Sequence, residues 1–389
     1  MDSAGLSEVT GLQLMVDTHT RLDAIDASVV APIVSTLLDT SRPVEVTAWT
    51  CAAVASGMGG QGVYRVSGSG LLDGEATEWS AILKVLRSGE ENTDPTSETY
   101  WLREREAIRS GLLDGVEDGV SMPRCLAIED IAPDETWLWF EELYNDMPHP
   151  WPTETWADIA RQFGRWQGEY LVGKPLPSHD WLCRGWLERC FTDWGPPRLS
   201  GQLPQPVFSR LYPGDSAARI ERFWEHRDTY LAAYRRAPLA VAHLDAHLRN
   251  LFYRGGRVVA VDWAFASIEA AGADLCGLIV GCVYMGEALP AEYREFDRAV
   301  FQGYLAGLAD VGWRGDADAI RFSFLVASCL RLATVFVSTA HMLANDLDNG
   351  FWRVMATLLG AEDQEETILR WARGNQFLAE CADEARSLL

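Results

Sequence analysis

The spacing of apolar residues changes near residue 144 and divides the chain into a strand-rich part and a helical part. Before that point, short or alternating apolar runs predict five strands: 44–54, 63–66, 79–86, 124–128 and 136–141. A loop is expected at Ser67–Gly70. One helix is expected between the third and fourth strands, from Asp94 and Pro95 to Gly111, because Asp caps a helix and Pro suits its first position.

Long patterns of helical period dominate the rest of the chain, in the ranges 153–172, 181–193, 216–234, 275–285, 293–308, 317–343 and 365–388. The segment before them, 144–152, is rich in turn-forming residues and is the expected boundary. We therefore expect an N-terminal helical extension at 1–40, a strand-rich lobe at 41–143 and a helical lobe at 144–389.

Composition narrows the classes of partner. The net charge of −23 repels nucleic acid and anionic membranes and attracts cations. The acidic residues either keep the surface soluble or line a pocket for a polyamine or amino sugar, and charge alone leaves both open. Eight scattered cysteines without C-x-x-C spacing favour reduced thiols in a cytoplasm. No signal-peptide pattern is present, and the longest apolar segment, 275–285, is far shorter than the ~20 residues of a membrane span.

Candidate chemistry gathers in one segment of the helical part. His243, Asp245 and Asn250 have the H-x-D-x-x-x-x-N spacing of a kinase catalytic loop, and Asp262 follows after a short apolar run. Phosphoryl transfer needs a carboxylate for the acceptor hydroxyl and oxygen ligands for Mg²⁺. Asp245 suits the first task, Asn250 and Asp262 the second, and His243 is expected to brace the loop. The alternative is a polar turn between two strands.

A glycine-rich run in the strand-rich part matches G-x-G-x-x-G through Gly57, Gly59, Gly60 and Gly62. The motif also fits dinucleotide-binding proteins, but there a helix must follow at once. The alternating residues 63–66 indicate a strand, which favours a hairpin over ATP phosphates. Lys84, in Ala-Ile-Leu-Lys, parallels the kinase lysine that reaches those phosphates. A solvent-facing lysine is the alternative.

Lys84 then needs an acidic partner on the following helix. Glu104 and Glu106 compete, but Glu104 shares its helix face with apolar residues and Glu106 does not. Glu104 is therefore the expected partner. The last strand ends at the boundary, where the backbone of Glu141 and Leu143 is expected to hydrogen-bond to adenine.

Together these residues resemble the aminoglycoside phosphotransferase and choline-kinase-like family. The segment from His243 to Asn250 is similar to its H-G-D-x-H-x-x-N motif, including the second histidine, His247. Asp262-Trp263 is similar to its D-W pair, and Gly272-Ala273-Asp274-Leu275 to the segment that follows. The resemblance implies a bilobed α+β protein-kinase-like fold, with a small antiparallel sheet lobe carrying one main helix and a larger, mainly helical lobe.

The resemblance also implies roles and departures. Asp274 is expected to brace the catalytic loop, with His243 and His247 in support. Leu244 stands where the family usually has Gly. No A-P-E segment is present, which argues against protein substrates regulated by an activation loop.

The expected function is transfer of the γ-phosphate of ATP, with Mg²⁺, to a hydroxyl of a small and possibly cationic molecule: an aminoglycoside, amino sugar or amino alcohol. Three alternatives stay open: a kinase of a neutral molecule such as a sugar or homoserine, a nucleotide-binding pseudokinase, and an oxidoreductase built on the glycine motif.

Overall fold

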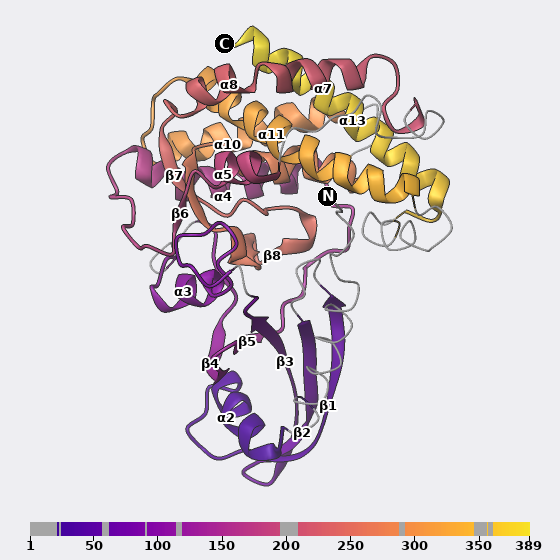
Figure 1. The fold of residues 1–389 in the computed structure, drawn as a ribbon. Helices are drawn as coiled ribbons and strands as arrows, with labels where there is room; N and C mark the ends of the chain where they lie inside the picture. Colours follow the sequence, from indigo (N-terminus) through magenta and orange to yellow (C-terminus); the bar gives the residue numbers. More distant parts are fainter. Residues whose placement is uncertain are drawn as a thin grey trace. The chain divides into compact units, whose positions relative to one another are not determined.

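The computed structural model describes residues 22, 25–56, 62–89, 92–113, 119–194, 209–287, 292–345, 356 and 361–389 (Figure 1). The chain forms two compact units. Unit 1 comprises Met1–Leu112 and Met122–Tyr144, and unit 2 comprises Leu113–Ser121 and Asn145–Leu389.

Unit 1 is built on a five-stranded antiparallel sheet of order β1-β2-β3-β5-β4. The strands are β1 (Glu45–Ser56), β2 (Gly62–Leu72), β3 (Glu75–Arg87), β4 (Cys125–Ala132) and β5 (Glu135–Glu141). Helix α2 (Ala27–Leu37) packs its apolar side chains on this sheet, in a core that includes Val30, Leu83 and Trp139. All five predicted strands are present.

Two details of unit 1 differ from the prediction. The expected loop Ser67–Gly70 lies inside β2 and pairs with both neighbouring strands. Its glycines are needed there because β1 is irregular opposite them, and a Cβ at Gly68 would collide with the backbone of Ala48. The helix α3 spans only Arg103–Arg109.

Helix α3 does not begin at Asp94 as predicted. Asp94 forms a separate turn instead, in which its carboxylate accepts the N–H of Thr96 at 2.8 Å. The buried Arg103 guanidinium then takes the carbonyl oxygens of Ser97 and Glu98, so the backbone there forms no helical ladder. The predicted end is confirmed, since Gly111 has a φ of 65°.

Unit 2 is mainly helical. Its helices are α4 (Thr153–Leu171), α5 (Trp186–Trp194), α7 (Ser216–Glu225), α8 (Arg227–Tyr234), α9 (Cys282–Tyr284), α10 (Tyr293–Asp310), α11 (Ala317–Asn345) and α13 (Gln364–Ser387). Helices α4 and α10 pack closely (Figure 1) because Gly303 and Gly307 admit the backbone of Ala157 and Arg161. In the part of the chain that is described, no helix is long and apolar enough to cross a membrane.

The predicted helices of unit 2 are present with three changes. The range 216–234 breaks at His226 into α7 and α8. The range 181–193 begins its helix only at Trp186, after the short strand β6 (Cys183–Arg184). The range 275–285 is a π-helical turn, η3 (Cys276–Gly281), that continues into α9.

Short strands of unit 2 position the candidate chemistry. β7 (Leu239–Ala242) and β6 flank β10 (Ser267–Ala270) in a three-stranded sheet. A separate hairpin joins β8 (Leu251–Arg254) to β9 (Arg257–Ala260). The polar loop predicted to be catalytic therefore runs from the end of β7 into β8.

Candidate active site

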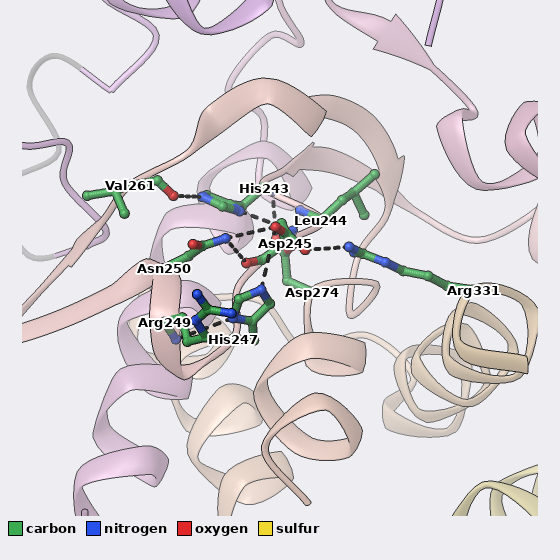
Figure 2. Close-up of polar contacts among 9 residues, drawn as sticks. All are labelled: His243, Leu244, Asp245, His247, Arg249, Asn250, Val261, Asp274 and Arg331. Atoms are coloured by element: carbon green, nitrogen blue, oxygen red, sulfur yellow. Dashed lines mark hydrogen bonds and ion pairs between the residues drawn. The ribbon is translucent and has the colours of Figure 1, made fainter. Parts of the chain in front are cut away.

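The loop from His243 to Asn250 leaves β7 and ends in a 3-10 turn, η1 (Leu248–Asn250). Figure 2 shows the side chains of Asn250, His247 and Arg331 (from α11) pointing toward Asp245. Asp274, from the segment before η3, contacts the backbone at the start of the loop. All of these residues belong to unit 2. The structure thus brings together most of the side chains that the spacing motif singled out.

Asp274 holds the start of the loop. Its carboxylate accepts the backbone N–H groups of His243 at 3.0 Å and Leu244 at 2.6 Å, and the amide of Gln167 at 2.7 Å. Burial raises the pKa of Asp274 to about 6, although these hydrogen bonds oppose the shift. The geometry suits the bracing role expected of this residue, because two of these three hydrogen bonds hold the backbone at the start of the loop.

His243 is fully buried and also braces the loop. Its Nε2 donates to the carbonyl of Val261 at 2.9 Å, and its Nδ1 accepts the N–H of Asp245 at 3.1 Å. Burial lowers the pKa of His243 to about 4, so the ring is neutral at neutral pH. The ring of Trp263 packs edge-on against it at 4.5 Å between centroids. His243 therefore fixes the backbone at Asp245.

Leu244 has a φ of 63°, in the left-handed region that favours glycine. This conformation costs about 1–2 kcal/mol in a residue with a Cβ. The side chain is buried, and the backbone N–H is held by Asp274. The departure from the family's Gly is thus accommodated without displacing a polar group of the loop.

Asp245 receives three positively polarised partners. The Asn250 amide donates to its Oδ2 at 2.8 Å, Arg331 donates to its Oδ1 at 2.5 Å, and the Nε2 of His247 lies 3.6 Å from its Oδ2. Burial alone would raise the pKa of Asp245, but the interactions with His247 and Arg331 outweigh it, so the pKa lies well below its usual range. The carboxylate is ionised and oriented, and 17% of its side-chain surface stays exposed.

Arg331 is a site residue that the sequence reasoning missed. Its guanidinium lies over the rings of Trp186, at 5.5 Å, and Phe265, at 5.8 Å. A sequence signal existed: Arg331 is the only Lys, Arg, Asp or Glu between Arg321 and Asp346. A charge in so apolar a helix predicts a partner, since charged side chains are seldom buried unpaired.

The two expected metal ligands, Asn250 and Asp262, offer side-chain oxygen atoms. The Nδ2 of Asn250 donates to Asp245, so its Oδ1 points away from that carboxylate (Figure 2). Asp262 precedes η2 (Trp263–Phe265) with a φ of 65°. Among the described residues no group of three or more His, Cys, Asp or Glu could hold a metal. Because Mg²⁺ takes one or two protein oxygens beside nucleotide phosphates, this pair fits an ion that arrives with a nucleotide.

In unit 1, Lys84 and Glu104 form a buried ion pair with an Nζ–Oε2 distance of 2.5 Å. Glu106 instead accepts hydrogen bonds from Arg105. Of the two glutamates considered, Glu104 is therefore the partner of Lys84. The solvent-facing alternative for Lys84 is wrong, because the residue is only 6% exposed. Its role in holding phosphates stays a prediction.

The remaining predicted nucleotide contacts are less complete. Gly57, Gly59 and Gly60 lie outside the described residues, and Gly62 opens β2 paired with Ser56. The strand that follows excludes the helix that a dinucleotide motif requires.

At the expected adenine contact, the N–H of Glu141 already donates to the carbonyl of Arg124 at 3.1 Å, and Glu141 pairs with Ala81 of β3. Leu143 follows β5 in an irregular, half-buried segment. Both assignments stay predictions.

No family model matches the chain, and no curated protein matches it. Among solved structures, an amicoumacin kinase in complex with AMP-PNP, Ca²⁺ and Ami is 16% identical, with a TM-score of 0.53 over 89% of this chain and 96% of that one. A spectinomycin phosphotransferase in complex with ADP and spectinomycin is 12% identical (TM-score 0.48, 92% and 99%). A choline/ethanolamine kinase family protein from Mesorhizobium loti is 16% identical (TM-score 0.45, 85% and 93%). At such identities the likeness concerns the fold.

Proposed function

We propose that this chain, which has the α+β protein-kinase-like fold of the small-molecule kinases, is an ATP-dependent O-phosphotransferase. It would move the γ-phosphate of ATP to a hydroxyl of a small molecule. The observation that carries the proposal is the ionised Asp245, held by Asn250 at the end of a loop that Asp274 and His243 brace. Such a carboxylate can accept the hydroxyl proton and aim the oxygen at the phosphate.

The other residues would serve the nucleotide. Asn250 and Asp262 would hold Mg²⁺, which neutralises charge on the β- and γ-phosphates when bound. Lys84, fixed by Glu104, would bind the phosphates through its ammonium group. The glycine run at 57–62 would cover the phosphates, and the backbone of Glu141 and Leu143 would bind adenine.

For the acceptor, we propose an aminoglycoside, amino sugar or amino alcohol. The phosphate transfer would take place in the cytoplasm. The net charge of −23 supports an acceptor that carries an amine, because it draws cations toward the protein. A neutral sugar or homoserine is the alternative within the same reaction class.

A pseudokinase is the second candidate function. A pseudokinase usually lacks one of the phosphate-binding, metal-binding or base residues, whereas Lys84, Asp245, Asn250 and Asp262 are all present. The four together favour turnover.

The test is an ATP-consumption screen with Mg²⁺ across aminoglycosides, amino alcohols, sugars and amino acids. We expect ATP consumption that depends on one acceptor class and is lost in Asp245→Asn. Binding of Mg·ATP without consumption for any acceptor would favour the pseudokinase. Tight binding of NADH without binding of ATP would revive the oxidoreductase.

A further inference from the structure

The Arg331 guanidinium has more hydrogen-bonding capacity than its surroundings use. A guanidinium offers five N–H donors. Among the described residues, Arg331 donates one hydrogen bond, from Nη2 to Asp245 Oδ1. The side chains of both residues are partly exposed, at 14% for Arg331 and 17% for Asp245. An acceptor that reaches Asp245 therefore meets a cation with unused donors beside it.

A second arginine on the same helix shows what a purely structural guanidinium looks like in this protein. Arg321 donates two hydrogen bonds to Asp297 and two to Glu384, which joins α11 to α10 and α13. It also lies over two aromatic rings, as Arg331 does. Within the described part of the chain, protein carboxylates accept four hydrogen bonds from Arg321 and one from Arg331.

Two aromatic rings hold the guanidinium of Arg331 in position. Trp186 is buried at the start of α5, and Phe265 packs against it with 4.8 Å between ring centroids. Both rings lie within 6 Å of the guanidinium, the range in which a ring attracts a cation. They hold the planar group without using its N–H donors, so those donors stay available to a ligand.

We propose that Arg331 is a specificity-determining residue that binds an oxygen of the acceptor, a hydroxyl or a carboxylate, next to the hydroxyl that Asp245 orients. This proposal rests on the proposed kinase function. An ammonium group in that position would face the guanidinium at close range and be repelled. If the acceptor carries an amine, the amine lies away from the reacting hydroxyl.

The test compares acceptors that differ in charge beside the same hydroxyl. Two matched series serve: glucosamine, glucose and glucuronate, and ethanolamine, ethylene glycol and glycolate, together with derivatives of any acceptor found in the screen. The full chain and three variants are assayed with Mg·ATP: Arg331→Met, Arg331→Lys and Arg294→Met. Arg294 is 74% exposed and pairs only at the surface with Glu380, so its loss makes the same change in net charge elsewhere.

Where the varied group stands beside the reacting hydroxyl, the wild-type protein should prefer its neutral or anionic form, measured as kcat/KM. Amino acceptors whose amine lies farther from that hydroxyl stay favoured. Arg331→Met should lower that preference for oxygen over ammonium by about tenfold or more. Arg331→Lys should keep the charge preference but raise KM, because it loses the planar fork. Arg294→Met should behave as wild type. Thermal unfolding and Mg·ATP binding check that each variant is folded.

Two failures are distinguishable. If the wild-type protein phosphorylates acceptors but Arg331→Met keeps the same charge preference, Arg331 only supports Asp245 and the inference is overturned. If no acceptor of the screen is phosphorylated, the proposed function itself falls, and this inference falls with it.

Discussion

The two units hold their key charges in contrasting ways. In unit 1, Lys84 and Glu104 form a closed pair with side chains 8% and 5% exposed. In unit 2, the Asp245 carboxylate contacts an arginine, an asparagine and a histidine. Neither Asp245 nor Arg331 is fully buried. A closed pair, with both side chains buried, fixes the ammonium in place. An open cluster, with partly exposed side chains, allows a substrate to form hydrogen bonds with its charged groups. We infer that unit 1 supplies fixed charge and unit 2 supplies the reacting groups.

The largest effect should come from the open cluster. Asp245→Asn keeps the side-chain shape but removes the base, so the phosphate-transfer rate should fall by ~10²–10⁴-fold while Mg·ATP binding persists. Steady-state transfer and nucleotide titration measure the two effects. Asp310→Asn is the matched control, since Asp310 also pairs with arginines but lies on α10 away from the loop. Transfer at the wild-type rate in Asp245→Asn would show that this carboxylate is not the base.

Loss of the closed pair should lower both the stability of the protein and its affinity for ATP. Lys84→Met removes the buried ammonium that pairs with the Glu104 carboxylate, which should cost about 3–5 kcal/mol of unfolding free energy. Adding Glu104→Gln removes the buried negative charge, so the double variant should recover most of that loss yet still bind ATP poorly. Denaturant unfolding and ATP titration separate the two results. A single variant as stable as the wild type would mean that the pair is not closed.

A buried carboxyl on β10 of unit 2 gives a pH-dependent effect. Glu269, on β10, accepts hydrogen bonds from Leu187 N–H at 3.0 Å and Tyr234 Oη at 3.1 Å, and burial raises its pKa to about 7 from 4.5. Its folded-state pKa is the higher one, so its stabilising contribution is complete below pH 4.5 and is lost as the pH rises through about 7.

Glu269→Gln should therefore match the wild type below pH 4.5 and exceed its unfolding free energy by up to about 3 kcal/mol above about pH 8. Thermal or denaturant unfolding across this range measures the difference. Glu188→Gln is the control, because the Arg235 hydrogen bond lowers the pKa of Glu188 and the trend should be opposite. A difference that does not vary with pH would mean that Glu269 titrates normally.

The smallest effect should come from the proposed metal ligand. Asp262→Asn keeps the left-handed backbone, which Asn tolerates, but removes one negative charge. Nucleotide affinity should fall on the order of tenfold, and only when Mg²⁺ is present. Calorimetric titration of ATP with and without Mg²⁺ is the measurement. An equal loss in both conditions would assign Asp262 a role other than metal binding.

The contacts that could be predicted from the sequence are those between residues close together along the chain. The strands, the Lys84–Glu104 contact and the Asp245–Asn250 contact follow from periodicity and from motif spacing over 20 residues or fewer. The contact between Asp245 and Arg331 spans 86 residues and depends on how α11 packs, which no local pattern encodes.

Other misses had local causes. The start of α3 was misplaced because Arg103 takes the carbonyl oxygens that a longer helix would use. The break at His226 separates two helices whose apolar periodicity reads as one. At the first of these places, side-chain hydrogen bonds over five and six residues override the helical pattern.

We propose that Asp245 directs the γ-phosphate of ATP onto an acceptor hydroxyl. The most direct measurement incubates the wild-type protein and Asp245→Asn with Mg²⁺, γ-labelled ATP and the best acceptor of the screen, and identifies the labelled product by mass spectrometry. We expect a labelled phosphomonoester on the acceptor with the wild-type protein and almost none with the variant. Equal labelling by both proteins, or label found only in free phosphate, would contradict it.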